Sequence, residues 1–151
     1  LEINGQPHIL PIAEIHFIDY PHNKPKIVSY DAKWDESTFD YQATQRVFPT
    51  LPAPLSNEIH DLVLNCWQAF NLKSYARVDI RCDANNKAWV LEVNANPCLA
   101  KDAGFAAAAL QSGPSYSQLI SNLVESAMSG ASQESRHLQA PPHNQAIRSN
   151  H

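Results

Sequence analysis

The sequence is poor in glycine, in cysteine and in positive charge, and each shortage excludes a class of protein. The four glycines among 151 residues are dispersed, so there is no glycine-rich loop to cradle phosphate groups. Three cysteines lie far apart, which argues against a disulfide framework and indicates a reducing compartment. We expect two of them, Cys66 and Cys82, to be buried. The formal net charge of −4 offers no basic surface for nucleic acid.

Long apolar runs are also missing. No stretch of about 18 apolar residues occurs, and the first residues show no signal-peptide pattern. We therefore expect a cytoplasmic protein without a membrane partner. The length of the chain suits one domain or part of one.

Residues 76–94 carry the most informative pattern in the chain, that of a β-hairpin. Apolar and polar side chains alternate on both sides of a predicted two-residue turn at residues 85–86. This turn places Asp79 opposite Glu92 and Arg77 opposite Asn94, all on one face. The other face is then filled by three apolar pairs: Val78 with Val93, Ile80 with Leu91, and Cys82 with Trp89.

Two carboxylates that face each other across a hairpin repel, so Asp79 and Glu92 need a neutralising partner. One interpretation is a surface charge lattice with Arg77 and Arg81, which flank Asp79 on the same face. The other is a divalent cation. Two carboxylates and the amide of Asn94 are oxygen ligands of the kind that suit magnesium, which keeps its remaining positions for water and phosphate.

The rest of the chain predicts an α+β fold. We expect strands within residues 8–18 and 26–30, a long irregular segment over residues 31–54, and a disordered polar tail at 129–151 that leaves a domain at 1–128. A helix of about four turns should begin at Ser56, an alanine-rich helix at Asp102, and a closing helix at a capping box formed by Ser115 and Gln118. The buried stripes are predicted to be Ile59, Leu62, Val63, Cys66 and Phe70 in the first helix, and Leu119, Ile120, Leu123, Val124 and Ala127 in the last.

Several of these segments together resemble a known family. Residues 75–79 followed by residues 91–97 are similar to the end of an ATP-grasp ligase, in particular of the D-alanine–D-alanine ligase group. Residues 29–34 resemble that group's active-site loop, in which a tyrosine is followed three residues later by a lysine, and residues 115–120 resemble its closing helix. The resemblance spans about residues 10–128 and implies the C-terminal part of an ATP-grasp domain, an antiparallel sheet packed with helices.

This resemblance implies an ATP-dependent carboxylate–amine ligase. In such an enzyme ATP phosphorylates a carboxylate, and an amine displaces phosphate from the resulting acyl phosphate. Two magnesium ions (Mn²⁺ being possible in their place) would bridge the ATP phosphates. Carried over by position, Asp79 would hold one ion, Glu92 would bridge both, and Asn94 would hold the other.

Three further residues receive roles from the resemblance. Arg77 would point at the transferring phosphate and at the oxyanion, the alternative being a salt bridge to a neighbouring carboxylate. Lys33 would reach the terminal phosphate and Tyr30 would line the substrate pocket, the alternative being a solvated lysine and a partly buried tyrosine. Glu92, Lys33 and Arg77 would thus contact the nucleotide and its metals.

The sequence also departs from the family. Cys98 stands where a glycine-methionine-threonine run would begin, and no serine follows before Ser112, so the acceptor, an amino acid or a peptide, stays open. We expect Cys98 to be a small packing residue, and Lys101 is a candidate cation for an acceptor carboxylate. Because adenine-clamping residues are missing, we expect the chain to be a fragment that needs the N-terminal half of the ligase and shows no turnover alone. A homodimer is compatible with the sequence.

Two other functions are compatible with parts of this pattern. One is a non-catalytic ATP-grasp-like module that binds nucleotide or metal. The other is a metal-dependent phosphohydrolase, which would need further histidine or aspartate ligands. The joint presence of Arg77, Asp79, Glu92 and Asn94 favours the ligase.

Overall fold

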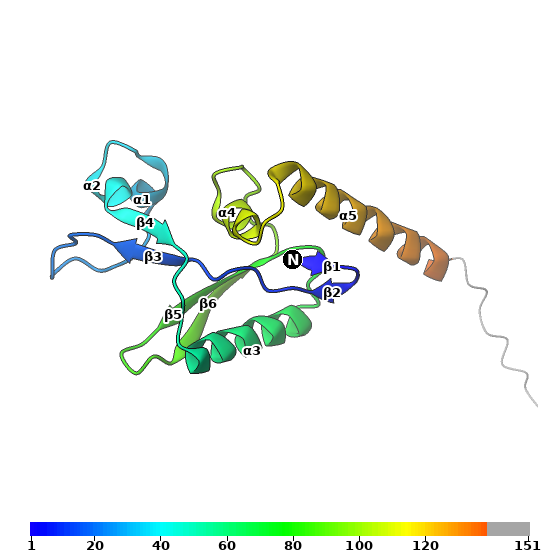
Figure 1. The fold of residues 1–151 in the computed structure, drawn as a ribbon, viewed down its shortest axis with the longest axis horizontal. Helices are drawn as coiled ribbons and strands as arrows, with labels where there is room; N and C mark the ends of the chain where they lie inside the picture. The colour runs from blue at the N-terminus through cyan, green and yellow to red at the C-terminus, as the bar shows by residue number, and fades with distance from the viewer. Residues whose placement is uncertain (139–151) are drawn as a thin grey trace, which may run out of the picture.

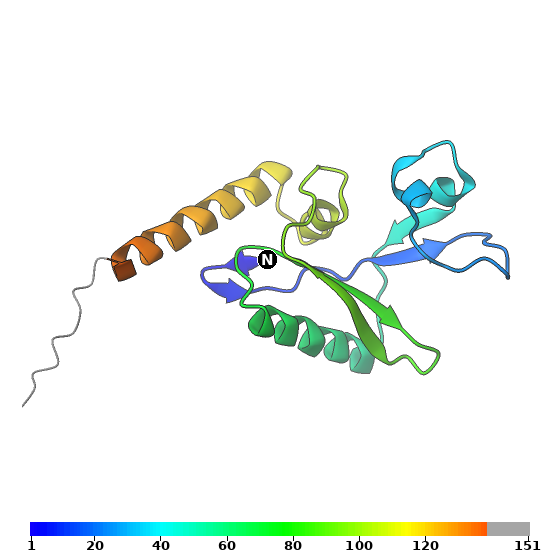
Figure 2. The same ribbon diagram turned by 180° about the vertical axis from the view of Figure 1, so that it is seen from behind.

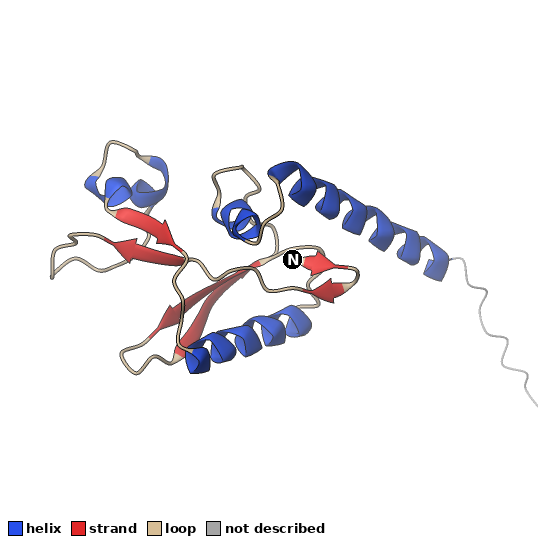
Figure 3. Ribbon diagram, in the orientation of Figure 1, coloured by secondary structure: helices blue, strands red, loops and turns tan. Residues whose placement is uncertain are grey.

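A computed structural model of the chain describes the backbone of residues 1–138 and the side chains of residues 1–128. Helices and short antiparallel strands are mixed along the chain, as Figures 1 and 3 show, which confirms the predicted α+β class. In chain order the elements are β1 (Glu2–Ile3), β2 (Gln6–Pro7), β3 (Glu14–Phe17), α1 (Tyr30–Trp34), α2 (Phe39–Gln42), β4 (Thr44–Val47), α3 (Ala53–Ala69), β5 (Arg77–Cys82), β6 (Ala88–Asn94), α4 (Gly104–Gln111) and α5 (Tyr116–Leu138).

The strands form three two-stranded antiparallel sheets, β1–β2, β3–β4 and β5–β6. In the second sheet Glu14 pairs with Val47 and Phe17 with Thr44, so α1 and α2 lie in the connection between the two strands. The prediction of an irregular segment over residues 31–54 is therefore wrong, because it contains two helices, a strand and the start of α3. The strand predicted at 26–30 is also absent, since Ser29 caps α1 by accepting a hydrogen bond from the Ala32 amide at 3.2 Å.

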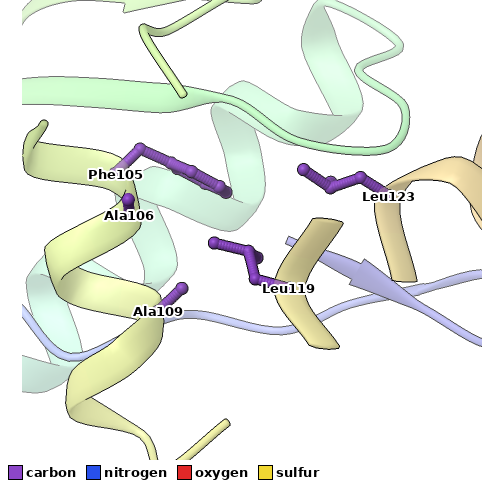
Figure 4. Packing of buried hydrophobic residues seen from close by; sticks show 5 residues of the cluster. All are labelled: Phe105, Ala106, Ala109, Leu119 and Leu123. Atoms are coloured by element: carbon purple, nitrogen blue, oxygen red, sulfur yellow. The ribbon is translucent and has the colours of Figure 1, made fainter. Parts of the chain in front are cut away.

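The main core lies between α4 and α5 (Figure 4). Ala106 and Ala109 present small side chains on α4, which lets Leu119 of α5 pack beside Phe105 and become fully buried. The predicted capping box is confirmed, because the Ser115 amide donates to Gln118 Oε1 at 2.7 Å and the Gln118 amide donates to Ser115 Oγ at 3.3 Å. The predicted α5 stripe is wrong at its far end, since Val124 and Ala127 are exposed.

Two helix starts differ from the sequence-based prediction. Helix α3 begins at Ala53, before Ser56, with Pro52 as its N-cap. Pro54 lies in the first turn, where the fixed φ of proline suits the helix. Helix α4 has Ala103 rather than Asp102 as its N-cap, without a side-chain hydrogen bond. In α3 Ile59 is buried, whereas Phe70, predicted to be core, is 65 % exposed just beyond the helix end.

Helix α3 packs along the β5–β6 hairpin, and both views show the two side by side (Figures 1 and 2). Glu58 of α3 fixes this contact by accepting a hydrogen bond from the Ala88 amide of β6 at 3.1 Å. At the other end of the chain, α5 continues to Leu138 and so runs through the first part of the tail predicted to be disordered. The remainder of that tail, residues 139–151, lies outside the described residues. In the part of the chain that is described, no helix is long and apolar enough to cross a membrane.

Candidate functional site

The register of the β5–β6 hairpin decides whether the predicted site exists. Arg77 pairs with Asn94 and Asp79 pairs with Glu92, as predicted. The two carboxylates therefore stand opposite each other, because facing residues of an antiparallel pair project to the same side. Closer to the turn the predicted apolar pairs are wrong: Ile80 pairs with Val90, Arg81 with Trp89, and Cys82 with Ala88.

Two irregularities explain this partial agreement. The turn has three loop residues rather than two, since the Asp83 amide donates to the Lys87 carbonyl at 3.0 Å and Asn86 adopts a positive φ of 60°. After three residue pairs, the pairing shifts again between Asp79 and Ile80, where Leu91 is the extra residue of a β-bulge. The two shifts cancel, and the register is restored where Asp79 meets Glu92.

The bulge also moves apolar side chains to unexpected positions. Trp89 now lies opposite Arg81 and is 51 % exposed, with the Lys87 ammonium 4.5 Å from the centre of its ring. Leu91 is 68 % exposed, and Cys82, predicted to be buried, is exposed as well. Partial burial still raises the pKa of the Cys82 thiol, helped by nearby Glu58.

Arg77 forms a bidentate pair with Asp79. Its Nε donates to Oδ1 at 2.6 Å and its Nη2 donates to Oδ2 at 2.9 Å. The bond to Asp79 raises the pKa of Arg77, and the charge of Glu92 adds to this effect. In the described part of the chain no hydrogen bond or ion pair reaches the Glu92 carboxylate. Asp79 is thus partly neutralised by the protein, while Glu92 keeps its oxygens available.

Asn94 is held by residues that sequence reasoning did not assign to the site. Its Oδ1 accepts a hydrogen bond from the Asn96 amide at 2.9 Å. The Asn96 side-chain oxygen in turn accepts a hydrogen bond from the Tyr75 hydroxyl at 2.9 Å, and the Tyr75 ring packs 5.4 Å from the ring of Phe105. A chain of contacts therefore runs from the α4–α5 core to the amide oxygen of Asn94. Tyr75 and Asn96 lie within the two segments that resemble the family, which was the only signal that pointed to them.

The oxygen donors of this face suit one kind of cation. Among the described residues, no group of three or more histidine, cysteine, aspartate or glutamate side chains is placed to hold a metal. Asp79, Glu92 and Asn94 offer two carboxylates and one amide, a set that fits magnesium or manganese better than zinc. Because Arg77 engages both oxygens of Asp79, a cation at this face would share that carboxylate with the guanidinium.

The other predicted residues lie apart from the hairpin. Tyr30 is 76 % exposed and Lys33 is exposed on α1, which both views place away from the strands of the hairpin (Figures 1 and 2). The structure thus brings together Arg77, Asp79, Glu92 and Asn94, and does not bring Lys33 or Tyr30 to them.

The loop after β6 differs from its prediction at one position. Cys98, expected to be a packing residue, is exposed, and so is Lys101. A second cation that sequence reasoning missed lies beside this loop, because Arg46 of β4 donates to the Asp102 carbonyl at 3.2 Å. Gly104 lies next to that guanidinium, because a Cβ there would be in ordinary van der Waals contact with two of its nitrogens at 3.9 Å.

Residues 1–125 match the family model described as D-ala D-ala ligase C-terminus. The chain belongs to this family. It is 30 % identical over 123 residues to a D-alanine–D-alanine ligase of Desulforudis audaxviator, which covers 80 % of the chain and 36 % of that protein. An uncharacterised protein, y4sG, of Sinorhizobium fredii is 29 % identical over 126 residues, covering 81 % of the chain and 34 % of its own length.

Solved structures agree with this family assignment. A D-alanine–D-alanine ligase from Bacillus anthracis superposes with a TM-score of 0.64 at 26 % identity, covering 83 % of the chain and 37 % of that protein. A structure of the Bacillus anthracis ligase complexed with ATP gives 0.59 at 26 % identity, over 64 % of the chain and 33 % of that protein. The chain therefore spans about a third of the length of the relatives it matches. The predicted membership of the D-alanine–D-alanine ligase group of ATP-grasp proteins is confirmed.

Proposed function

We propose that the chain supplies the metal- and phosphate-binding face of an ATP-dependent carboxylate–amine ligase. The observation that carries this proposal is the facing pair of Asp79 and Glu92, with Asn94 two residues after Glu92 on the same strand. Family membership supports the same reaction type, since the named relatives are D-alanine–D-alanine ligases.

In this proposal the nucleotide is ATP and the divalent cations are magnesium, with manganese as a substitute. Asp79, Glu92 and Asn94 would hold these ions, because carboxylate and amide oxygens are the ligands that magnesium prefers. The ions, when bound, neutralise phosphate charge and hold the triphosphate in place for in-line transfer. The neutral amide of Asn94 limits repulsion in an otherwise anionic cluster.

Arg77 stabilises charge at the reacting centre. The hydrogen bond to Asp79, together with the negative charges of both Asp79 and Glu92, raises the pKa of its guanidinium. Its fixed positive charge suits a transferring phosphoryl group and a later oxyanion. Lys33 binds the terminal phosphate after α1 approaches the hairpin, and Tyr30 then borders the substrate pocket. The donor carboxylate takes the phosphoryl group of ATP, ADP leaves, and the acceptor amine displaces phosphate to form the amide bond while losing its proton.

The substrates in this proposal are amino acids or short peptides. Cys98 stands where the family has a glycine. Lys101 in the same loop and Arg46 of β4 beside it add two cations, so the acceptor site differs from that of the family. A cationic environment of this type suits an acceptor that carries a free carboxylate.

A second candidate, a non-catalytic nucleotide- or metal-binding module, is favoured by one specific observation. The bidentate bond between Arg77 and Asp79 satisfies both groups without any ligand, and α1, which carries Lys33, lies apart from the hairpin (Figure 1). A phosphohydrolase is not supported, because it would need further acidic or histidine ligands and none gather around this face in the described residues.

The test uses the complete gene product that contains these residues. It is incubated with ATP, Mg²⁺ and a panel of D- and L-amino acids and dipeptides, and both ADP and ligated product are measured. The donor carboxylate is labelled with ¹⁸O, because an acyl phosphate delivers one labelled oxygen to inorganic phosphate. Amine-dependent ADP with labelled phosphate supports the ligase. Nucleotide binding without turnover supports the binding module, and ADP that forms without any acceptor contradicts ligation.

A further inference from the structure

Arg81 links the hairpin to the segment that carries Lys33 and Tyr30. It lies two residues after Asp79 on β5, and its Nη1 donates to the main-chain oxygen of Lys26 at 2.7 Å. Since side chains alternate along a strand, Arg81 projects to the same side of the hairpin as Asp79. The predicted charge lattice around Asp79 is thus wrong for this residue: Arg77 pairs with the carboxylate, and Arg81 reaches away to another part of the chain.

The segment that Arg81 contacts is tied together by its own side chains. We call residues 24–42 the α1 segment. Lys24 forms an ion pair with Asp40 of α2, and its ammonium lies 5.2 Å from the ring centre of Tyr20 and 5.7 Å from that of Phe39. Ser29, the N-cap of α1, donates from its hydroxyl to the second oxygen of Asp40 at 3.4 Å. The carboxylate of Asp40 on α2 therefore joins Lys24, at the start of the segment, to Ser29, the N-cap of α1. Holding Lys26 in place should thus restrain the whole segment.

We infer that Arg81 is a positioning residue that tethers the α1 segment to the β5–β6 hairpin and so sets how Lys33 and Tyr30 approach the Asp79–Glu92 face. This inference rests on the proposed function for its catalytic consequence, although the tether itself does not. Arginine suits the task, because its guanidinium stays charged and makes a strong hydrogen bond to a carbonyl while its long stem spans the gap between the two elements.

The chain provides a matched control for this contact. Arg46 also donates from its guanidinium to a main-chain oxygen of a distant segment, that of Asp102, across 56 residues, compared with 55 for Arg81 and Lys26. Both arginines are exposed strand residues, but Arg46 does not contact the α1 segment through this bond. Replacing either arginine by alanine removes one hydrogen bond from a guanidinium to a main-chain oxygen, but only Arg81→Ala removes it from the α1 segment.

Amide hydrogen exchange of the complete gene product, without nucleotide, tests the tether. Arg81→Ala is expected to speed exchange over residues 26–34 while leaving α4 and the described part of α5 protected, which also shows that the variant is folded. Arg81→Lys, which keeps a cationic donor, should restore part of the protection, and Arg46→Ala should leave residues 26–34 unchanged. Unchanged exchange in Arg81→Ala, or the same increase in Arg46→Ala, would overturn the inference.

Kinetics then test the positioning role. Arg81→Ala should raise KM for ATP or lower kcat by about tenfold, since a hydrogen bond from a charged group is lost, while Mg²⁺ binding by the hairpin stays as in the wild type. Faster exchange with unchanged kinetics would show a structural tether only and would refute the positioning role. If the ligase assay shows no turnover at all, the proposed function fails, and the exchange experiment still decides the tether.

Discussion

The β5–β6 hairpin and the β3–β4 unit both carry polar residues of the candidate site, but they position them differently. In the hairpin the strands are neighbours in the chain, and their register alone places Asp79 opposite Glu92. In the β3–β4 unit the strands pair across an insertion that contains α1 and α2, and Lys33 sits on a helix of five residues. Asp79 and Glu92 are placed by a backbone ladder, whereas the α1 segment between β3 and β4 is joined to the hairpin by a side-chain bond from Arg81.

This difference suggests a division of labour. A face that has to hold two cations at fixed spacing gains from a rigid ladder, because misplaced ligands lose affinity steeply. In the proposed function Lys33 reaches a phosphate only after the nucleotide has entered, and a segment that can move helps it to do so. The bond from Arg81 to the Lys26 carbonyl links this segment to the hairpin. The two regions thus provide the fixed and the adjustable parts of one site in the proposed function.

Glu92→Gln is expected to have the largest effect of the variants that test this difference between the two regions. It keeps the shape of the side chain but removes the charge that would hold the ions in the proposed function, so turnover of ATP should fall by at least about 100-fold. Glu14→Gln, on the corresponding strand of the β3–β4 unit, is the matched control and should have little effect. ADP release and far-UV circular dichroism are measured for both. Equal activity of Glu92→Gln and the wild type would remove the hairpin from the site.

The sequence predicted the hairpin well because the information is local. Alternation over residues 76–94 and the tendency of asparagine to adopt positive φ required no knowledge of distant segments. The capping box at Ser115 was equally readable, since its two partners are three residues apart. The bulge at Leu91 was not, because it compensates for a turn one residue longer than expected and leaves no mark in the alternation.

Strand β3 falls within the predicted strand at residues 8–18, but β4 and its pairing with β3 were not predicted, for the converse reason. Val47 pairs with Glu14, which lies more than 30 residues earlier in the chain, and no short-range sequence pattern indicates that pairing. Two short caps, Ser29 and Thr38, organise α1 and α2 in a stretch whose composition resembles a loop. Arg81 was assigned to the wrong partner because periodicity shows the face of a residue, and not the segment that its long side chain reaches.

The two regions should also differ in how much apolar packing supports them. Ile59 of α3, the helix along the hairpin, is 6 % exposed, and Ile59→Ala should lower the free energy of unfolding by about 2–5 kcal/mol. Ile15 of β3 is 37 % exposed, and the same substitution there should cost about 1 kcal/mol or less. Urea unfolding of both variants measures the difference. Equal costs would mean that β3 is covered in the protein used for the experiment.

Tyr75→Phe sharpens the comparison at the end of the hairpin. The variant keeps the ring that packs on Phe105 but loses the hydroxyl that orients Asn96 and, through it, Asn94. Loss of an outer hydrogen bond should weaken Mn²⁺ binding by about tenfold, measured by titration calorimetry or by electron paramagnetic resonance. Tyr41→Phe, on α2, removes a hydroxyl from the other region and should leave the affinity unchanged. Identical affinities in both variants would show that Asn94 needs no support from the core.

The smallest effect concerns the turn itself and its response to pH. Hydrogen bonds from the Trp89 indole first, and then from the Lys87 and Asn85 amides, hold the pKa of Asp83 below its ordinary value. The folded pKa is therefore the lower one, so the stabilisation by ionised Asp83 is complete above about pH 4 and disappears as the pH falls through the folded pKa. The Nε1–H resonance of Trp89 should shift over that acid range in the wild type and stay constant in Asp83→Asn. A resonance that shifts equally in both proteins would mean that the titration of a group other than Asp83 moves it, and would contradict the role of this carboxylate.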